Sequence, residues 1–232
     1  MRMKNTGGYG QFCPVAKAAE VLAVKWTPVI IRELLCGTYR FNDLKKGVPL
    51  MSPSLLSTRL QELEDAGIVR REAARTGRGH EYYLTPAGEA LRPIIEAQGL
   101  WAQKWLEQNL QDKDLDPSLL IWDMHRNIDF AHIPDERRFT VYIELAGVAA
   151  NQRRWWLLME NETVDVCMKD PGYEVDVYVN ASIRTMAEIW MGQRKFRDAE
   201  NAGELTLDGT RTDCSSFRKS LKLSHFAPTA NN

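Results

Sequence analysis

Residues 52–85 read SPSLLSTRLQELEDAGIVRREAARTGRGHEYYLT, and this stretch decides the fold of the first half of the chain. Ser52 can cap a helix, and Pro53 can occupy its first position. Gly67 is a natural end for that helix. The leucines between them recur at helical spacing and predict one buried stripe: Leu56, Leu60 and Leu63.

The opposite face of the predicted helix carries short polar side chains. These are Ser54, Ser57, Thr58 and Gln61, with Arg59 beside them. Short hydrogen-bonding groups let a helix approach base edges closely, and a neighbouring cation can contact phosphate. An ordinary solvated helix face has the same composition, so this helix alone leaves both interpretations open.

The residues after this helix favour DNA binding. Residues 68–74 and 81–85 are predicted strands, and the turn between them reads RTGRGH. The glycines suit a tight turn, while Arg75 and Arg78 at its tip suit a phosphate or minor-groove contact. A helix pair followed by such a hairpin is the order of a winged helix.

The flanking segments complete this first domain. Helices are predicted at about 16–22, 28–35 and 41–46, and Gly47 and Pro49 form the turn before Ser52. A long helix is expected from Thr85-Pro86 to about Asn109, with an apolar stripe too large for a small domain to cover. We expect that stripe to form a dimer seam or to pack on the second half: Leu91, Ile94, Ile95, Trp101, Trp105 and Leu106.

The composition is that of a soluble globular protein. The 232 residues are 44% hydrophobic and 26% charged, which allows two domains. No apolar run approaches the roughly 18 residues of a membrane span, so we expect a cytoplasmic protein. The four cysteines and four histidines lack metal-ligand spacing, and no cofactor is expected. Residues 1–110 hold 15 Lys+Arg and 11 Asp+Glu (+4), and residues 111–232 hold 15 and 20 (−5).

Residues 111–117 (QDKDLDP) mark the boundary between the two halves. We therefore expect a DNA-binding and dimerisation domain at 1–110 and a second domain at 111–232. After a helix at about 117–128, alternating apolar residues predict several strands, and further helices follow from Ser182 and near the C-terminus. The predicted fold is α+β: a winged helix-turn-helix domain, then an antiparallel sheet with helices on one side.

Ordered motifs in the first half resemble the HxlR-type winged-helix regulators, relatives of the MarR group, over about residues 10–108. The matching pieces are Cys13-Pro14-Val15-Ala16, Lys25-Trp26-Thr27-Pro28, Arg32-Glu33-Leu34-Leu35, Arg40-Phe41-Asn42-Asp43-Leu44, Ser52-Pro53, Arg59-Leu60, Leu63-Glu64, Gly67 and Tyr83-Leu84-Thr85-Pro86-Ala87-Gly88. The resemblance implies a bacterial homodimer that binds operator DNA, usually as a repressor and sometimes as an activator. The candidate DNA-binding residues are Arg40, Ser52, Ser54, Ser57, Thr58, Arg59, Gln61, Arg75 and Arg78.

Cys13 matches a cysteine near the N-terminus of that family, which senses oxidants or electrophiles in some members. A sensor thiol needs exposure and a lowered pKa. Cys13 precedes a helix start at Pro14, and Lys17 follows one turn later, so both features favour the thiolate. The alternative is a small apolar residue packed at the dimer seam.

The second half resembles sterol-carrier-protein-like domains over about residues 117–226. The pieces that carry the resemblance include Val175-Asp176-Val177, Gly192, Leu205-Thr206-Leu207 and Gly209. It implies an apolar tunnel between sheet and helices, and hence an effector domain for an apolar molecule. The candidate lining residues are Trp122, Trp155, Trp156, Met168, Met186 and Trp190. Large apolar residues at these spacings more often belong to a plain hydrophobic core, which is the alternative interpretation.

Two functions from different classes remain. The first is a homodimeric DNA-binding regulator, controlled by an apolar ligand or through Cys13. The second is an apolar-ligand carrier that uses the winged helix only to dimerise. No nucleophile elbow, phosphate loop or metal pattern occurs, so we do not expect an enzyme.

Overall fold

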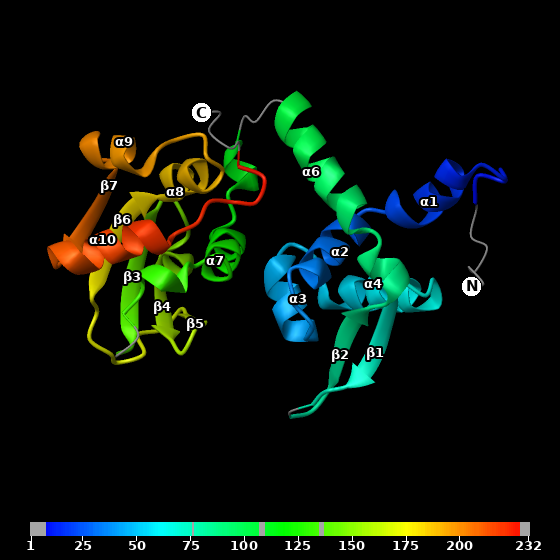
Figure 1. Cartoon of the computed structure of the whole chain (residues 1–232), viewed down its shortest axis with the longest axis horizontal. Helices are drawn as coiled ribbons and strands as arrows, with labels where there is room; N and C mark the ends of the chain where they lie inside the picture. Colours follow the sequence, from blue (N-terminus) through cyan, green and yellow to red (C-terminus); the bar gives the residue numbers. More distant parts are fainter. Residues whose placement is uncertain (1–7, 76, 107–109, 135–136, 228–232) are drawn as a thin grey trace. The chain divides into compact units, whose positions relative to one another are not determined.

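The structure, a computed structural model, describes residues 8–75, 77–106, 110–134 and 137–227. The chain divides between Ala102 and Gln103 into two compact units, each with its own hydrophobic core (Figure 1). The predictions for Thr76 in the hairpin turn and for a helix end at Asn109 concern residues outside the described part.

The N-terminal unit is built from helices and one hairpin. Its elements are α1 (Pro14–Leu22), α2 (Thr27–Leu35), α3 (Phe41–Gly47), α4 (Pro53–Asp65), β1 (Val69–Ala73), β2 (His80–Leu84), α5 (Pro86–Glu89) and α6 (Arg92–Trp105), whose last three residues lie beyond the division at Ala102. Helices α3 and α4 are joined by a short turn, and the antiparallel hairpin β1–β2 follows directly. This order confirms the predicted winged helix-turn-helix.

The predicted apolar stripe of α4 forms the centre of the N-terminal core. Leu56, Leu60 and Leu63 are buried, and they belong to one cluster with Ile30 and Ile31 of α2. Each fully buried side chain of this kind stabilises the fold by about 1.5–3 kcal/mol through the hydrophobic effect. Burial of one face of α4 therefore leaves its opposite face exposed.

The long helix predicted after Thr85 is broken. Helix α5 ends at Glu89, and α6 begins at Arg92. Pro93 has no N–H to donate to the carbonyl of Glu89, so a continuous helix would leave that carbonyl unpaired and would clash with the proline ring. The sequence contained this signal, and the uninterrupted helix was the wrong prediction.

The C-terminal unit is a sheet with helices. Its elements are η1 (Asp112–Asp114), α7 (Pro117–His125), η2 (Phe130–His132), β3 (Phe139–Ala146), η3 (Ala150–Gln152), β4 (Arg154–Glu160), β5 (Thr163–Cys167), β6 (Val177–Ser182), α8 (Ile183–Trp190), α9 (Phe196–Asn201), β7 (Leu205–Gly209) and α10 (Arg211–Ser220). Helices α7 and α8 begin at side-chain caps, because Asp116 and Ser182 accept hydrogen bonds from the backbone N–H groups of Leu119 and Thr185.

The strand order in this sheet is β5-β4-β3-β6-β7. Strands β3, β4 and β5 form an antiparallel meander, but β6 pairs with β3 in parallel, with Val141 opposite Val177. The prediction of a purely antiparallel sheet is therefore wrong for the central pair. The alternation of apolar residues determines which face of a strand is buried. It does not determine which strand β6 pairs with or in which direction, because these depend on the long connection between β5 and β6.

One face of the sheet carries the C-terminal core. Phe139, Val141, Ile143 and Leu145 of β3 are fully buried, in one cluster with residues from α7, α8 and α10. This arrangement agrees with the prediction of helices on one side of the sheet. The other face holds the ring contact between Tyr142 and Trp156, whose centroids lie 5.0 Å apart.

Candidate nucleic-acid interface

The start of α4 is fixed by local hydrogen bonds. The Ser52 hydroxyl accepts a hydrogen bond from the backbone N–H of Leu55 at 3.2 Å, as predicted for a cap. In the preceding turn, the Lys45 ammonium donates to the carbonyl of Pro49 at 2.5 Å. Both ends of the turn are thus held, and α4 leaves it in a defined direction.

A buried carboxylate packs beneath the same turn. Glu33 of α2 is fully buried and pairs with Arg32 at 2.5 Å. Gly47, at the end of α3, lies so close to Glu33 that a Cβ added there would be 1.9 Å from its Oε2 atom. Gly47 is therefore required for the close packing of α3 on α2, in addition to ending α3.

The exposed face of α4 divides into two groups of candidate residues. Ser54, Ser57 and Thr58 are exposed, although the Thr58 hydroxyl donates to the Ser54 carbonyl at 3.0 Å. Arg59 and Gln61 instead contact acidic residues on the following turn of α4, at 2.5 Å from Glu62 and 3.0 Å from Asp65. Only the first group presents side chains without a carboxylate partner.

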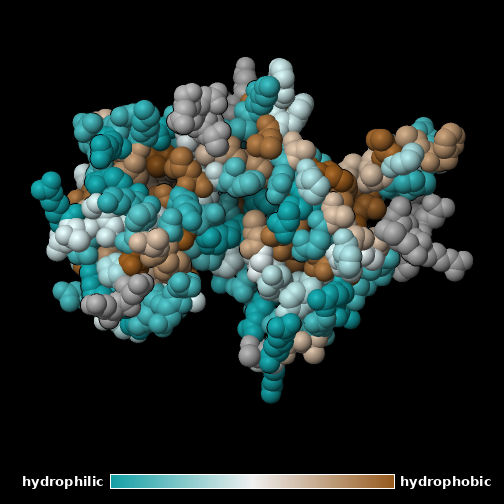
Figure 2. All heavy atoms as spheres, viewed as in Figure 1, coloured by the Kyte–Doolittle hydropathy of each residue, from teal (hydrophilic) through white to brown (hydrophobic). Residues whose placement is uncertain are grey.

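The hairpin forms an arm beside the helix pair (Figure 1). Arg75 and Arg78 are exposed near its tip, where Gly77 has a φ of 81° that suits glycine. The guanidinium of Arg75 lies 5.8 Å from the centre of the Tyr83 ring, and that of Arg70 lies 4.8 Å from it. Hydrophilic residues cover this arm in Figure 2.

Contacts between the hairpin and the segment before α3 fix the position of this arm. The rings of Tyr39 and Tyr83 lie 4.7 Å apart, and the backbone N–H of Tyr82 donates to the Tyr39 carbonyl at 2.8 Å. Arg40, one of the candidate DNA-binding residues, pairs with Glu81 at 3.3 Å. The Tyr83 hydroxyl donates to Glu81 at 2.6 Å, and this bond, followed by Arg40, lowers the pKa of the Glu81 carboxyl.

Sequence reasoning missed this set of contacts. Tyr39, Glu81, Tyr83 and Arg70 were not among the candidates, and Arg40 was assigned to DNA rather than to Glu81. A single sequence gives little indication of these contacts, because residues 39–40 and 81–83 are far apart along the chain. The alternation of Glu81 and Tyr83 on one strand is the only local hint that they share a face.

Cys13 occupies the position just before α1, as predicted. The backbone N–H groups of Ala16 and Val15 favour the thiolate and lower the pKa of Cys13. Lys17, the second expected cause, instead pairs with Glu20 at 3.0 Å. The thiol is partly exposed, so it combines access with a shifted pKa.

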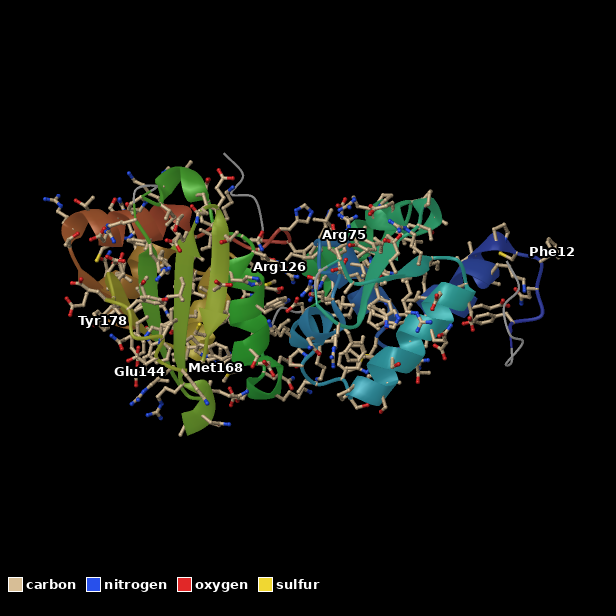
Figure 3. The ribbon with its side chains drawn as sticks, turned by 90° about the horizontal axis from the view of Figure 1, so that it is seen from below. Phe12, Arg75, Arg126, Glu144, Met168 and Tyr178 are labelled. Atoms are coloured by element: carbon tan, nitrogen blue, oxygen red, sulfur yellow. The ribbon has the colours of Figure 1, made fainter. Side chains whose placement is uncertain are left out.

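The candidate ligand-lining residues of the C-terminal unit fall in different environments. Trp155, Trp156, Met186 and Trp190 are buried, and Trp122 is partly buried. Met168 is 46% exposed and lies at the surface (Figure 3). Trp155 belongs to the C-terminal core. Trp156 lies on the opposite face of the sheet, since neighbouring residues of a strand point to opposite faces.

No group of three or more His, Cys, Asp or Glu side chains in the described part of the chain could hold a metal ion. No helix in that part of the chain has both the length and the apolar character needed to cross a membrane.

The fold and the interface together define a winged-helix DNA-binding protein. The model of the HxlR-like helix-turn-helix family matches residues 21–110, and the chain belongs to this family. The HTH-type transcriptional regulator YvaP of Bacillus subtilis is 36% identical over 104 residues, which cover 44% of this chain and 96% of YvaP. The chain is thus similar to transcription regulators that bind DNA through a helix-turn-helix.

YodB of Bacillus subtilis, another HTH-type transcriptional regulator, is 33% identical over 97 residues, or 41% of this chain and 87% of YodB. The structure of its reduced form has a TM-score of 0.38 and 30% identity, and covers 43% of this chain and all of that one. Cys13 lies before the residues that the family model matches.

Proposed function

We propose that this protein is a homodimeric, sequence-specific regulator, most simply a repressor, that reads operator DNA with α4 and contacts the backbone with the β1–β2 arm. The single observation that carries this proposal is the exposed polar face of α4 beside an arginine-bearing hairpin. In this proposal the protein regulates transcription by binding operator DNA in the cytoplasm and catalyses no reaction.

The two groups of contacts have different roles in this proposal. Ser54, Ser57 and Thr58 are short and exposed, so they can approach base edges in the major groove. Arg75 and Arg78 lie near the arm tip and contact phosphates or the minor groove. Arg59 can contact DNA only if its ion pair with Glu62 breaks. Gln61 likewise has to give up its hydrogen bond to Asp65.

The test is binding of the full chain to fragments of its own upstream region, followed by selection of bound sequences from a random pool. We expect Ser57→Ala and Thr58→Ala to change which bases are selected, because base contacts carry specificity. If both variants select the same sequence as the wild type with the same affinity, α4 does not read the bases.

The proposed dimer seam is the apolar surface of α6 and α1. Figure 2 shows hydrophobic residues at the surface over these helices. Trp101 and Trp105 of α6 are 57% and 66% exposed, and Phe12, which projects beside α1 in Figure 3, is 99% exposed. Large exposed aromatic side chains of this kind mark protein interfaces.

Sedimentation equilibrium tests this seam. The wild type should sediment as a dimer, and Trp101→Glu with Trp105→Glu should give a folded monomer that binds operator DNA more weakly. A wild type that stays monomeric at all concentrations contradicts the proposed dimer. That result would not contradict the binding of DNA by α4, which the selection experiment tests separately.

We also propose that the C-terminal unit is an effector domain for an apolar molecule. Its core is rich in large side chains, and Trp155, Met186 and Trp190 would contact a ligand that enters between sheet and helices. Native mass spectrometry of the purified protein tests this. Release of a bound lipid together with failure to find any bound DNA sequence would favour the carrier function instead.

A thiol switch is the second candidate for control, and the lowered pKa of the partly exposed Cys13 favours it. Diamide should then release the wild type from operator DNA and leave Cys13→Ser bound, while Cys36→Ser should behave as the wild type. Release of Cys13→Ser by diamide would exclude this control.

A further inference from the structure

A surface hollow in the C-terminal unit has a polar and cationic lining. Its volume is about 490 Å³, and it lies between α10 and the short turn η2. The lining residues are Ala131, His132, Arg211, Thr212, Ser215, Ser216 and Lys219. Among these residues there is no carboxylate and no large apolar side chain, so its chemistry differs from that of an apolar tunnel.

The residues of α10 that line the hollow lie on one face of the helix. Residues 211, 215 and 219 are spaced by four, which brings them into line along the helix, and 212 and 216 lie next to them. Phe217 and Ser220, on the other side of α10, are buried. The exposed face therefore places a guanidinium at one end, an ammonium at the other and hydroxyls between them.

The two walls of the hollow are held together by the backbone. The N–H of Asp129, just before η2, donates to the carbonyl of Ser220 at 2.7 Å. Ile128 and Leu221 form an antiparallel bridge, and the N–H of Lys222 donates to the carbonyl of Asn127. The hollow is thus a feature of the packed fold rather than a gap between independent loops.

Neighbouring carboxylates are engaged elsewhere. Asp129 accepts from the N–H of Ala131 at 3.2 Å and pairs with Lys222 at 3.3 Å, and these contacts lower the pKa of its carboxyl. Asp213, in the first turn of α10, is buried and pairs with Arg137 at 2.8 Å. These two acids therefore have cations of their own, and neither lines the hollow.

The basic residues of α10 differ in their partners. Arg218 pairs with Glu200 at 2.6 Å, whereas Arg211 and Lys219 form no ion pair with any residue in the described part of the chain. Ser215 and Ser216 are weaker helix formers than Ala, Glu or Lys, so helix stability does not account for them. Two unpaired cations with hydroxyl donors between them fit an oxyanion.

We propose that this hollow binds a small anionic metabolite through a phosphate or carboxylate group, held by Arg211 and Lys219 with the Thr212, Ser215 and Ser216 hydroxyls. The residues that line the site all belong to the C-terminal unit, so binding of the anion can be measured without operator DNA. A concave site of this size suits a small molecule. Extended nucleic acid instead requires a continuous basic surface, and residues 111–232 carry 20 acidic against 15 basic residues.

The test is a titration of the isotope-labelled full chain with inorganic pyrophosphate and, separately, with citrate, followed by amide NMR at constant ionic strength. We expect saturable shifts at residues 131–132 and 211–219. Arg211→Ala with Lys219→Ala should weaken binding at least 10-fold, because two charge-assisted contacts are lost. Tighter binding of pyrophosphate or of citrate identifies the oxyanion as phosphate or carboxylate.

The control replaces two exposed cations of the same unit, Lys195→Ala with Arg197→Ala, and should leave the affinity unchanged. Ser216→Glu, which places a carboxylate in the hollow, should abolish binding in a chain whose melting temperature shows that it is folded. The proposal is wrong if neither anion gives saturable shifts there, or if the control weakens binding equally. It is also wrong if a random DNA duplex produces the same shifts at lower concentration.

Discussion

Replacing Arg75 and Arg78 of the β1–β2 arm by alanine should weaken binding to every DNA sequence alike. Both side chains are exposed, and the Arg75 guanidinium lies over the Tyr83 ring, whereas only the Arg75 backbone contacts the Glu81 carboxylate. The anchor of the arm consists of Tyr39, Glu81 and Tyr83, which the two substitutions leave intact. We therefore expect the variant to fold as the wild type does.

The size of the effect follows from the release of counterions. Each phosphate contact contributes about 0.9 to the slope of log affinity against log salt concentration. Two arginines in each protomer make four contacts in a dimer, so the slope should decrease by about 3.6. When salt rises from about 50 to about 200 mM, the wild type should lose about 150-fold more affinity than the variant.

The assay is fluorescence anisotropy with a labelled operator and with a scrambled duplex at four or more salt concentrations. The double variant should lose affinity for both duplexes in the same proportion, so that the specificity ratio stays constant. Lys195→Ala with Arg197→Ala is the matched control, since it removes two exposed cations from the other unit and should not change the slope.

An unchanged slope in the double variant would refute the reasoning, because it would mean that neither arginine neutralises a phosphate. A loss confined to the operator would also contradict it. In that case the arm would read bases in the minor groove, and its contribution would belong to specificity.

Three other predictions concern stability and reactivity. Gly47→Ala should lower the free energy of unfolding by about 1–3 kcal/mol in urea denaturation, because the new Cβ would meet Glu33; an unchanged midpoint would refute the packing argument. Cys13 should react with iodoacetamide at lower pH than Cys214, whose pKa is raised by burial, and mass spectrometry of the peptides should show that order. Burial and the hydrogen bond to a glutamate raise the pKa of Tyr142 to about 12, so the unfolded chain ionises first as pH rises; stability should fall between about pH 10 and 12 in the wild type, and less in Tyr142→Phe.

Local features of the sequence predicted most of the fold. Caps such as Ser52 and Ser182, and apolar stripes such as Leu56, Leu60 and Leu63, act within one or two turns, so they can be recognised without the rest of the chain. Pro93 is a local signal of the same kind, because it lacks a hydrogen-bond donor and interrupts a helix. The prediction of one long helix relied on the periodic apolar pattern instead.

Pairings between distant residues could not be predicted in this way. The parallel pairing of β3 with β6 and the contact of Tyr39 with Tyr83 join segments that no local pattern connects. Partners on the same helix face were also missed. Arg59 and Gln61 were chosen as donors to DNA, yet each lies one turn from an acidic residue that competes for it.

The anchor of the β1–β2 arm has a consequence for the operators that this protein can accept. Because Tyr39 and Arg40 tie the arm to the start of α3, an arm and its helix pair form one stiff body that meets the DNA as a whole. In the proposed dimer, the separation of two such bodies is then set by the dimer seam and not by bending of the arms. One inserted base pair rotates the second half-site around the duplex by about a tenth of a turn, and stiff arms cannot follow it.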